Sequence, residues 1–196
     1  MIPIAGHNFI DISFFAGKMM RRLLALSLLL ASSALAESQA AQYDSLSADQ
    51  IQDTEYVKKW LARKDLKIDH ASIKFLNEQA EKREKTQYWD AAAKSYGEAM
   101  LLYPSPEAIL NYTNAQYKML KRIRERDSNP EQKKFSDMSR FLHRYRSAMA
   151  ADEVLHTLTD NQRNALKTDI DCLEKYTGTK QFQPGCDPLI GYGITK

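Results

Sequence analysis

Apolar side chains recur every three or four positions through most of the chain, and no segment alternates convincingly with a period of two. The first spacing places apolar side chains along one side of an α-helix, whereas alternation is the pattern of a half-buried strand. The chain has only 7 Gly and 6 Pro, which leaves little material for long loops. The pattern predicts an all-α protein whose helices are joined by short connections.

Capping residues and prolines mark where these helices begin and end. Ser47 and Gln50 have the spacing of a capping box, Asp69 can cap the next helix, and Ser105 with Pro106 is a strong helix start. A second capping box, Thr159-x-x-Gln162, opens the last predicted helix. The expected helices cover about 51–63, 70–85, 88–102, 106–124, 131–151 and 160–178. Gly178 is expected to end the last of these helices. About six helices in an antiparallel helix-turn-helix array are therefore predicted.

The segment after the last helix, residues 179–196, has no helical pattern and contains several prolines and glycines. We predict an irregular tail. Cys172 and Cys186 are the two cysteines of the chain, and they lie on the last helix and in this tail. In an oxidising compartment such a pair most simply forms a disulfide, which would hold the tail against the helices at a gain of about 3 kcal/mol. A redox or metal pair is the alternative, but the spacing and the absence of a nearby histidine give it little support.

The N-terminal segment has the layout of a secretory signal peptide. Arg21 and Arg22 precede the apolar run 23–30, and Ala34-Leu35-Ala36 resembles a cleavage site. The alternatives are a buried helix or an uncleaved anchor, although the run is too short to span a bilayer comfortably. We expect a signal peptide over 1–36 and a periplasmic or secreted protein; a start at Met19 or Met20 would make 1–18 an unused upstream extension. The further expected divisions are a flexible N-terminus over 37–46, a helical domain over 47–178 and the tail over 179–196.

The charge of the chain is uneven. Removal of residues 1–36 lowers the formal net charge from +3 to +1, yet residues 118–146 carry ten basic and four acidic side chains. Such a basic region can attract an acidic partner, although it can equally be a solvated surface near helix ends. Nucleic acid is not expected as a partner, because the chain is predicted to be exported and is nearly neutral overall. Contact with a membrane is expected only through the cleaved signal peptide.

The stretch from residue 89 to residue 104 has a recurrent pattern of aromatic and small side chains. Trp89, Ala92, Tyr96, Ala99 and Pro104 stand at offsets 0, 3, 7, 10 and 15. This resembles the second helix of a tetratricopeptide repeat, in which small residues let neighbouring helices approach and a proline closes the unit.

The resemblance to tetratricopeptide repeats covers about 70–150 and weakens away from this helix. Arg83 and Gln87 stand where an aromatic and a small residue are usual. Ala148 repeats the position of Ala99 after 49 residues rather than the usual 34 or so. A plain antiparallel helical bundle with accidental spacing is the alternative.

The resemblance implies a role for one polar stripe. Asn111, Asn114, Lys118 and Arg122 recur along one side of the helix over 106–124. In tetratricopeptide proteins the first helix of each unit lines a concave groove, where such side chains hold peptide backbone or carboxylates. With Arg140 and Arg144 of the basic region, these residues form the predicted partner-binding set. An ordinary hydrated helix surface is the alternative.

No arrangement in the sequence indicates catalysis, a metal site or a bound cofactor. Asp152 and His156 could meet on one helix face, but two ligands do not make a metal site. We therefore expect an exported, non-enzymatic helical adaptor that binds a protein or peptide segment, possibly acidic, in the cell envelope. An inhibitor or immunity protein that blocks an envelope enzyme or toxin is the alternative. A hydrolase of cell-wall glycan would need a framed pair of carboxylates, which the sequence does not show.

Overall fold

The structure is a computed structural model that describes residues 42–194, so the expected signal peptide and residues 37–41 lie outside the described residues. The described residues contain seven α-helices and no strand, which confirms the all-α prediction. The elements are η2 (Gln50–Gln52), α2 (Thr54–Leu61), α3 (His70–Lys85), α4 (Trp89–Leu102), α5 (Pro106–Arg124), α6 (Pro130–Leu155), α7 (Asp160–Thr179) and α8 (Asp187–Gly191).

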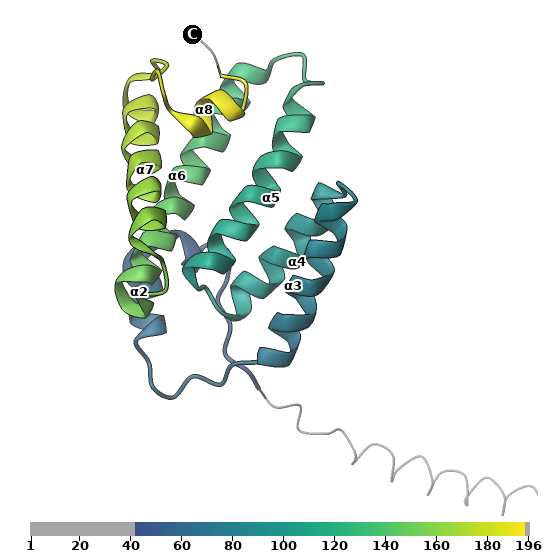
Figure 1. Ribbon diagram of the computed structural model, residues 1–196, viewed down its shortest axis with the longest axis vertical. Helices are drawn as coiled ribbons and strands as arrows, with labels where there is room; N and C mark the ends of the chain where they lie inside the picture. Colours follow the sequence, from purple (N-terminus) through teal and green to yellow (C-terminus); the bar gives the residue numbers. More distant parts are fainter. Residues whose placement is uncertain (1–41, 195–196) are drawn as a thin grey trace, which may run out of the picture. The chain divides into compact units, whose positions relative to one another are not determined.

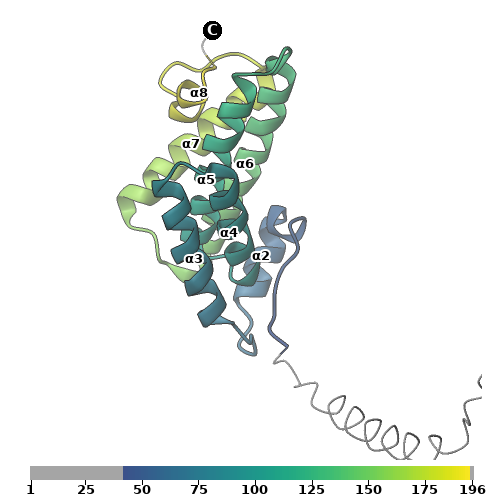
Figure 2. The ribbon, with the colours of Figure 1, turned by 90° about the vertical axis from the view of Figure 1, so that its right-hand side faces the viewer.

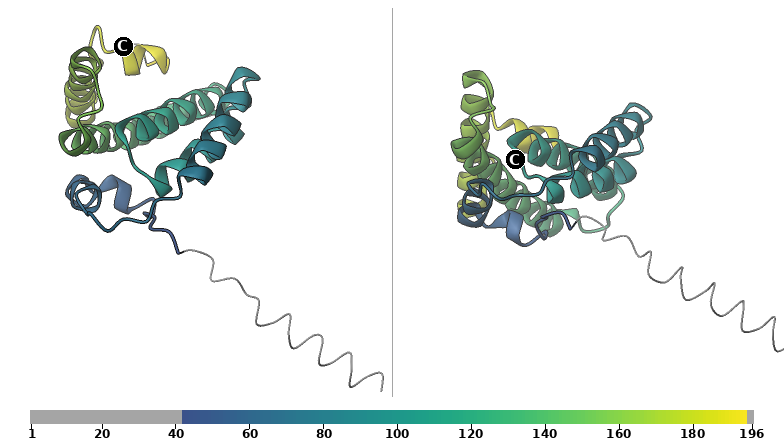
Figure 3. Two further views of the ribbon diagram at one scale, coloured as in Figure 1. Left: turned by 60° about the horizontal axis from the view of Figure 1, so that its bottom comes forward. Right: turned by 90° about the horizontal axis from the view of Figure 1, so that it is seen from below.

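Helices α3 to α7 form a row in which each packs on the next (Figure 1). Figure 2 views this row from its α3 end, and Figure 3 shows α7 and α3 at opposite ends with α5 and α6 between them. The N-terminal elements η2 and α2 do not precede α3 in this row, because they pack on α6 instead of on α3. The largest fully buried side chain, Phe141, belongs to α6, which contacts α2, α5 and α7.

The first predicted helix is divided into two elements. The amide of Ser47 donates to the Gln50 side chain at 2.8 Å and the Gln50 amide donates to the Ser47 hydroxyl at 3.3 Å, so the predicted capping box forms. It opens only the short 3-10 turn η2. The Asp53 carboxylate then accepts from the amides of Glu55 and Tyr56, both at 3.0 Å, and starts α2 as a separate helix.

Residues 43–46, which we expected to belong to a flexible N-terminus, instead pack on the helices. The Leu46 amide donates to the carbonyl of Leu101 at 2.8 Å, and Leu46 is buried. The Asp44 amide donates to the Lys67 carbonyl at 2.9 Å. These bonds fix the chain before η2, so the helical unit begins earlier than predicted.

Three later helix starts follow the predicted caps. Asp69 accepts from the Ser72 amide at 3.0 Å, and Ser105 accepts from the Ala108 amide at 3.1 Å. Thr159 and Gln162 form the reciprocal bonds of a capping box. Each side chain accepts a hydrogen bond from an amide that has no partner inside the helix. Because this contact is local, the sequence alone predicts these helix starts.

The C-terminal end differs from the prediction in two ways. Helix α7 continues through Gly178 to Thr179, and Lys180 takes the left-handed conformation with φ of 58°. The tail is also not wholly irregular, because residues 187–191 form α8. Five residues are too few to give a periodic pattern, and burial of Leu189 against the other helices stabilises this turn.

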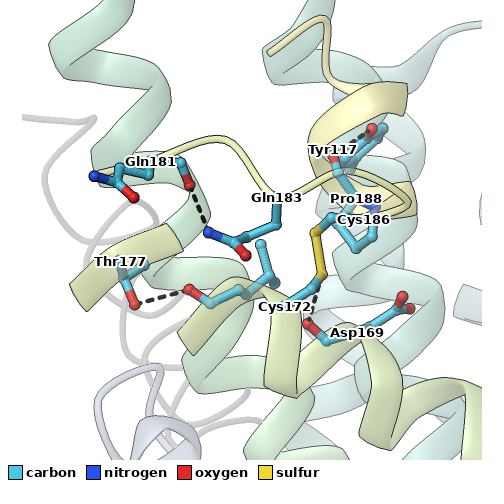
Figure 4. The surroundings of a disulfide bond; sticks show 9 residues. Tyr117, Asp169, Cys172, Thr177, Gln181, Gln183, Cys186 and Pro188 are labelled. Carbon is cyan, nitrogen blue, oxygen red and sulfur yellow. Dashed lines mark hydrogen bonds between the residues drawn. A yellow bond between two sulfur atoms is a disulfide. The ribbon is translucent and has the colours of Figure 1, made fainter. Parts of the chain in front are cut away.

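The predicted disulfide between Cys172 and Cys186 is present, with Cα atoms 5.7 Å apart (Figure 4). It joins α7 to the chain just before α8, and α8 lies between α7 and α5. The Tyr117 hydroxyl on α5 donates to the carbonyl of Pro188 at 3.0 Å. A disulfide of this kind is typical of proteins in an oxidising compartment.

A buried carboxylate links the tail to the row. Asp137 of α6 is fully buried and accepts from Arg124 Nε at 2.8 Å and from the Tyr192 hydroxyl at 2.6 Å. The Tyr192 ring packs on those of Tyr117 and Phe141, with centroids 5.1 and 5.9 Å away. The tail therefore completes the core instead of lying loosely on it.

Small side chains set the separation of α3, α4 and α5, as the spacing around Trp89 predicted. Ala80, Ala92, Ala93 and Ala115 are buried together around the ring of Tyr96. Arg83, which stands where an aromatic was expected, donates to the Ser95 hydroxyl at 2.6 Å instead. No tetratricopeptide identity follows from these contacts, since alanine-rich contacts also occur in plain bundles.

We expect Ala92→Leu to destabilise the protein by about 1–3 kcal/mol, because the larger side chain must enter a closely packed contact between three helices. Urea denaturation followed by circular dichroism would measure the change. Ala165→Leu on the exposed surface of α7 is the matched control and should change stability little. Equal effects of the two substitutions would contradict the packing described for Ala92.

Asp169 on α7 gives a pH-dependent prediction. Burial, followed by repulsion from Asp187, raises the pKa of its carboxyl from 3.8 to about 6. A raised folded-state pKa favours folding below the unfolded value, and this contribution is lost as the pH rises through about 6. The variant Asp169→Asn should therefore gain stability relative to wild type between pH 4 and about pH 7.

Urea denaturation at a series of pH values would test this, with Asp171→Asn on the exposed side of α7 as the control. If the difference in stability between Asp169→Asn and wild type stays constant over this range, folding does not raise the pKa of the Asp169 carboxyl.

Candidate functional site

The six predicted partner-binding residues do not form one patch. Asn111, Asn114 and Lys118 line a hollow of about 270 Å³ with Glu84 and Tyr117, which we call the Asn111 hollow. Lys118 Nζ lies 2.7 Å from a carboxylate oxygen of Glu84 and 4.3 Å from the centre of the Trp89 ring. The charge of Lys118 is therefore already compensated, which weakens this hollow as a site for an acidic partner.

Arg122 lies instead at a larger hollow of about 610 Å³, formed by the turn between α3 and α4 and by the end of α5. We call it the Ile123 hollow. Its walls combine large apolar side chains with two arginines: Tyr88, Trp89, Met119, Ile123, Arg122 and Arg126. Tyr88 is 65% exposed and Ile123 is 48% exposed, so both present apolar surface to solvent.

Local backbone geometry creates the α3–α4 side of this hollow. Gln87 has a φ of 60°, a left-handed conformation that reverses the chain within three residues of the end of α3. The amide of Tyr88 donates to the Arg83 carbonyl at 2.9 Å and fixes the turn. The contact with Lys118 holds the Trp89 ring against α5. Backbone hydrogen bonds and one cation–π contact thus place the side chains of Tyr88 and Trp89.

The electrostatic character of the Ile123 hollow is positive. Among residues 42–194, neither Arg122 nor Arg126 has a carboxylate within 4.0 Å. Asp127 also lines the hollow, but its carboxylate lies 2.7 Å from Lys133 Nζ, and the hydrogen bond from Lys133 lowers its pKa. Asp90 adds one exposed negative charge. The two arginines therefore outweigh the acidic side chains.

Arg140 and Arg144 lie on α6 and differ in their surroundings. Arg140 is exposed, with Nη1 3.9 Å from Asp137 Oδ1. Arg144 is half-buried and lies over the Tyr112 ring, 4.5 Å from its centre. It lines a small hollow of about 90 Å³ beside η2 and α4, which we call the Arg144 hollow. The two residues therefore face different surroundings despite their spacing on one helix.

Asp152 and His156 do not pair with each other. Asp152 accepts from Arg163 Nε at 2.7 Å and from the Leu158 amide at 2.8 Å, while His156 ends α6 in a left-handed conformation. Burial alone would raise the pKa of Asp152, but these two bonds lower it overall. No group of three or more potential metal ligands occurs within the described part of the chain. None of the helices over 42–194 is long and apolar enough to cross a bilayer.

Comparisons with protein-family models, with curated proteins and with solved structures give no match to this chain. The functional interpretation therefore depends on the geometry of its own residues.

Sequence reasoning did not single out Tyr88 or Ile123. They fall within the predicted helices over 88–102 and 106–124, and nothing in their spacing shows that the α3–α4 turn lies beside the end of α5. Met119 lines the same hollow beside them. The available signal was modest: large apolar residues stand at the predicted helix ends near positions 88 and 123, and arginines 122 and 126 lie close to the second of them in sequence.

Proposed function

We propose that the protein is an exported, non-enzymatic helical adaptor that binds an acidic protein segment at the Ile123 hollow. The segment would place an apolar or aromatic side chain between Tyr88 and Ile123, with its carboxylates directed to Arg122 and Arg126. Its compartment would be the periplasm or the extracellular space, in keeping with the signal-peptide pattern and the disulfide.

One observation supports this proposal most strongly: large exposed apolar side chains share a hollow with two arginines that have no carboxylate partner among residues 42–194. Exposed aromatic and aliphatic surface next to arginine is typical of protein-binding sites, where the apolar group supplies burial energy. Charge complementarity then selects acidic over basic segments and speeds association. The volume of about 610 Å³ is large enough for one aromatic side chain and its neighbours.

The proposal includes a repeat-like organisation of α3 to α6. The side chains that pair between α3 and α5, Glu84 and Lys118, are separated by 34 residues, the usual length of a tetratricopeptide unit. The buried alanines of α4 also agree with that pattern. In this interpretation the Ile123 hollow lies at the turn between the two helices of the first unit and not in the groove that the polar stripe suggested.

A displayed library of random peptides would test the proposal. We expect the disulfide-bonded protein to enrich peptides that combine an aromatic or large aliphatic residue with flanking Asp or Glu. Arg122→Glu with Arg126→Glu should weaken binding of an enriched peptide by about tenfold or more, because two charge-assisted contacts become repulsive. Fluorescence anisotropy of the labelled peptide would measure this change.

The matched control is Lys59→Glu with Lys175→Glu, which alters the net charge by the same amount on exposed surfaces of α2 and α7. Binding should be retained in this variant. A library without acidic enrichment, or an equal loss in both double variants, would refute a specific site at the Ile123 hollow.

A further inference from the structure

Arg144 is a half-buried cation that forms no ion pair within the described part of the chain. No carboxylate among residues 42–194 lies within 4.0 Å of its guanidinium. It donates to the side-chain oxygen of Gln116, and Nη2 lies 3.5 Å from the Tyr112 hydroxyl. These partners are neutral, so they orient the guanidinium without neutralising it.

The surroundings make this charge costly. Burial lowers the pKa of the Arg144 guanidinium and repulsion from Arg140 adds to this effect, while Tyr112 and the Asp137 carboxylate oppose it without cancelling it. Removing a charge from water without an adjacent counter-charge is unfavourable. The ring of Tyr112 offsets part of this cost through the cation–π contact. An anion beside Arg144 would offset more of it.

The neighbouring side chains are held in fixed positions. A Cβ at Gly97 would lie 3.1 Å from Tyr112 Cε2, so a larger residue here would require the ring to shift by a few tenths of an ångström. The Tyr112 hydroxyl accepts a bond from Gln116 Nε2 at 3.1 Å. Since its oxygen is the acceptor in this bond and in the contact with Arg144, its own proton is available to a further acceptor. Arg144 and Tyr112 thus supply preorganised donors at one place.

The Arg144 hollow lies beside these donors and has a mixed lining. Its volume of about 90 Å³ is enough to hold several water molecules. The lining beside Arg144 and Tyr112 is largely apolar, from Ile51, Gly97 and Leu101, and the exposed side chain of Gln52 stands at its edge. Polar donors beside an apolar lining suit an anion that carries a short hydrocarbon stem.

From this geometry we propose that the Arg144 hollow is a binding site for a small carboxylate, of the size of acetate or propionate. The carboxylate oxygens accept hydrogen bonds from the Arg144 guanidinium and the Tyr112 hydroxyl, and the hydrocarbon stem contacts Leu101 and Ile51. The carboxylate belongs to a free acid or to the side chain of an acidic residue. This site is separate from the Ile123 hollow and does not depend on the function proposed for it.

Nuclear magnetic resonance titration of the disulfide-bonded protein with sodium propionate would test this site. We expect saturable shifts of the Gly97 and Tyr112 amide signals, and none with propionamide, which has the same size without the charge. N-acetylglutamate amide presents the same carboxylate on a protein backbone, so its affinity relative to propionate distinguishes the two sources.

Two variants separate specific binding from a general salt effect. Tyr112→Phe removes one donor and Arg144→Lys replaces the planar guanidinium; each should weaken propionate binding by about tenfold while circular dichroism stays unchanged. Arg146→Lys, on the exposed side of the same helix, should bind propionate as wild type does. Shifts that do not saturate, equal shifts with propionamide, or unchanged affinity in both Tyr112→Phe and Arg144→Lys would overturn the proposal.

Discussion

The buried carboxylate of Asp137 is the contact on which the C-terminal half of this protein depends. It accepts from Arg124 at the end of α5 and from Tyr192 in the tail, so one side chain of α6 joins three parts of the chain. Breaking a buried pair of this kind leaves an uncompensated charge, which typically costs about 3–5 kcal/mol. The disulfide between α7 and the tail acts on the same region, because it keeps Tyr192 close to its partner.

The contact between Arg124 and Asp137 also determines which side chains at the end of α5 face the solvent. With Arg124 turned inward to Asp137, the two residues that precede it, Arg122 and Ile123, lie at the surface and line the Ile123 hollow. A helix turns by about 100° per residue, so fixing one side chain fixes the direction of its neighbours. The apolar and basic character of the Ile123 hollow thus follows from a structural contact on the opposite side of the helix.

Local chemistry explains which parts of the fold could be predicted. The caps at Asp69, Ser105 and Thr159 act within three residues, and they gave helix starts that the structure confirms. The disulfide was predictable because the chain has a single pair of cysteines. Helix α8 was missed, since it is stabilised by burial against distant helices. The Ile123 and Arg144 hollows were missed for the same reason: their residues are brought together from different helices, and no spacing along the chain encodes such contacts.

Site-specific photo-crosslinking in the cells that make the protein tests the central claim most directly. A photoreactive amino acid would replace Tyr88 at the Ile123 hollow, Asn114 at the Asn111 hollow or Lys59 on α2. The account predicts one dominant crosslinked protein from position 88, and not from positions 114 or 59. Crosslinking to the same protein from position 114, with none from position 88, would move the binding surface to the polar stripe of α5 and contradict the account.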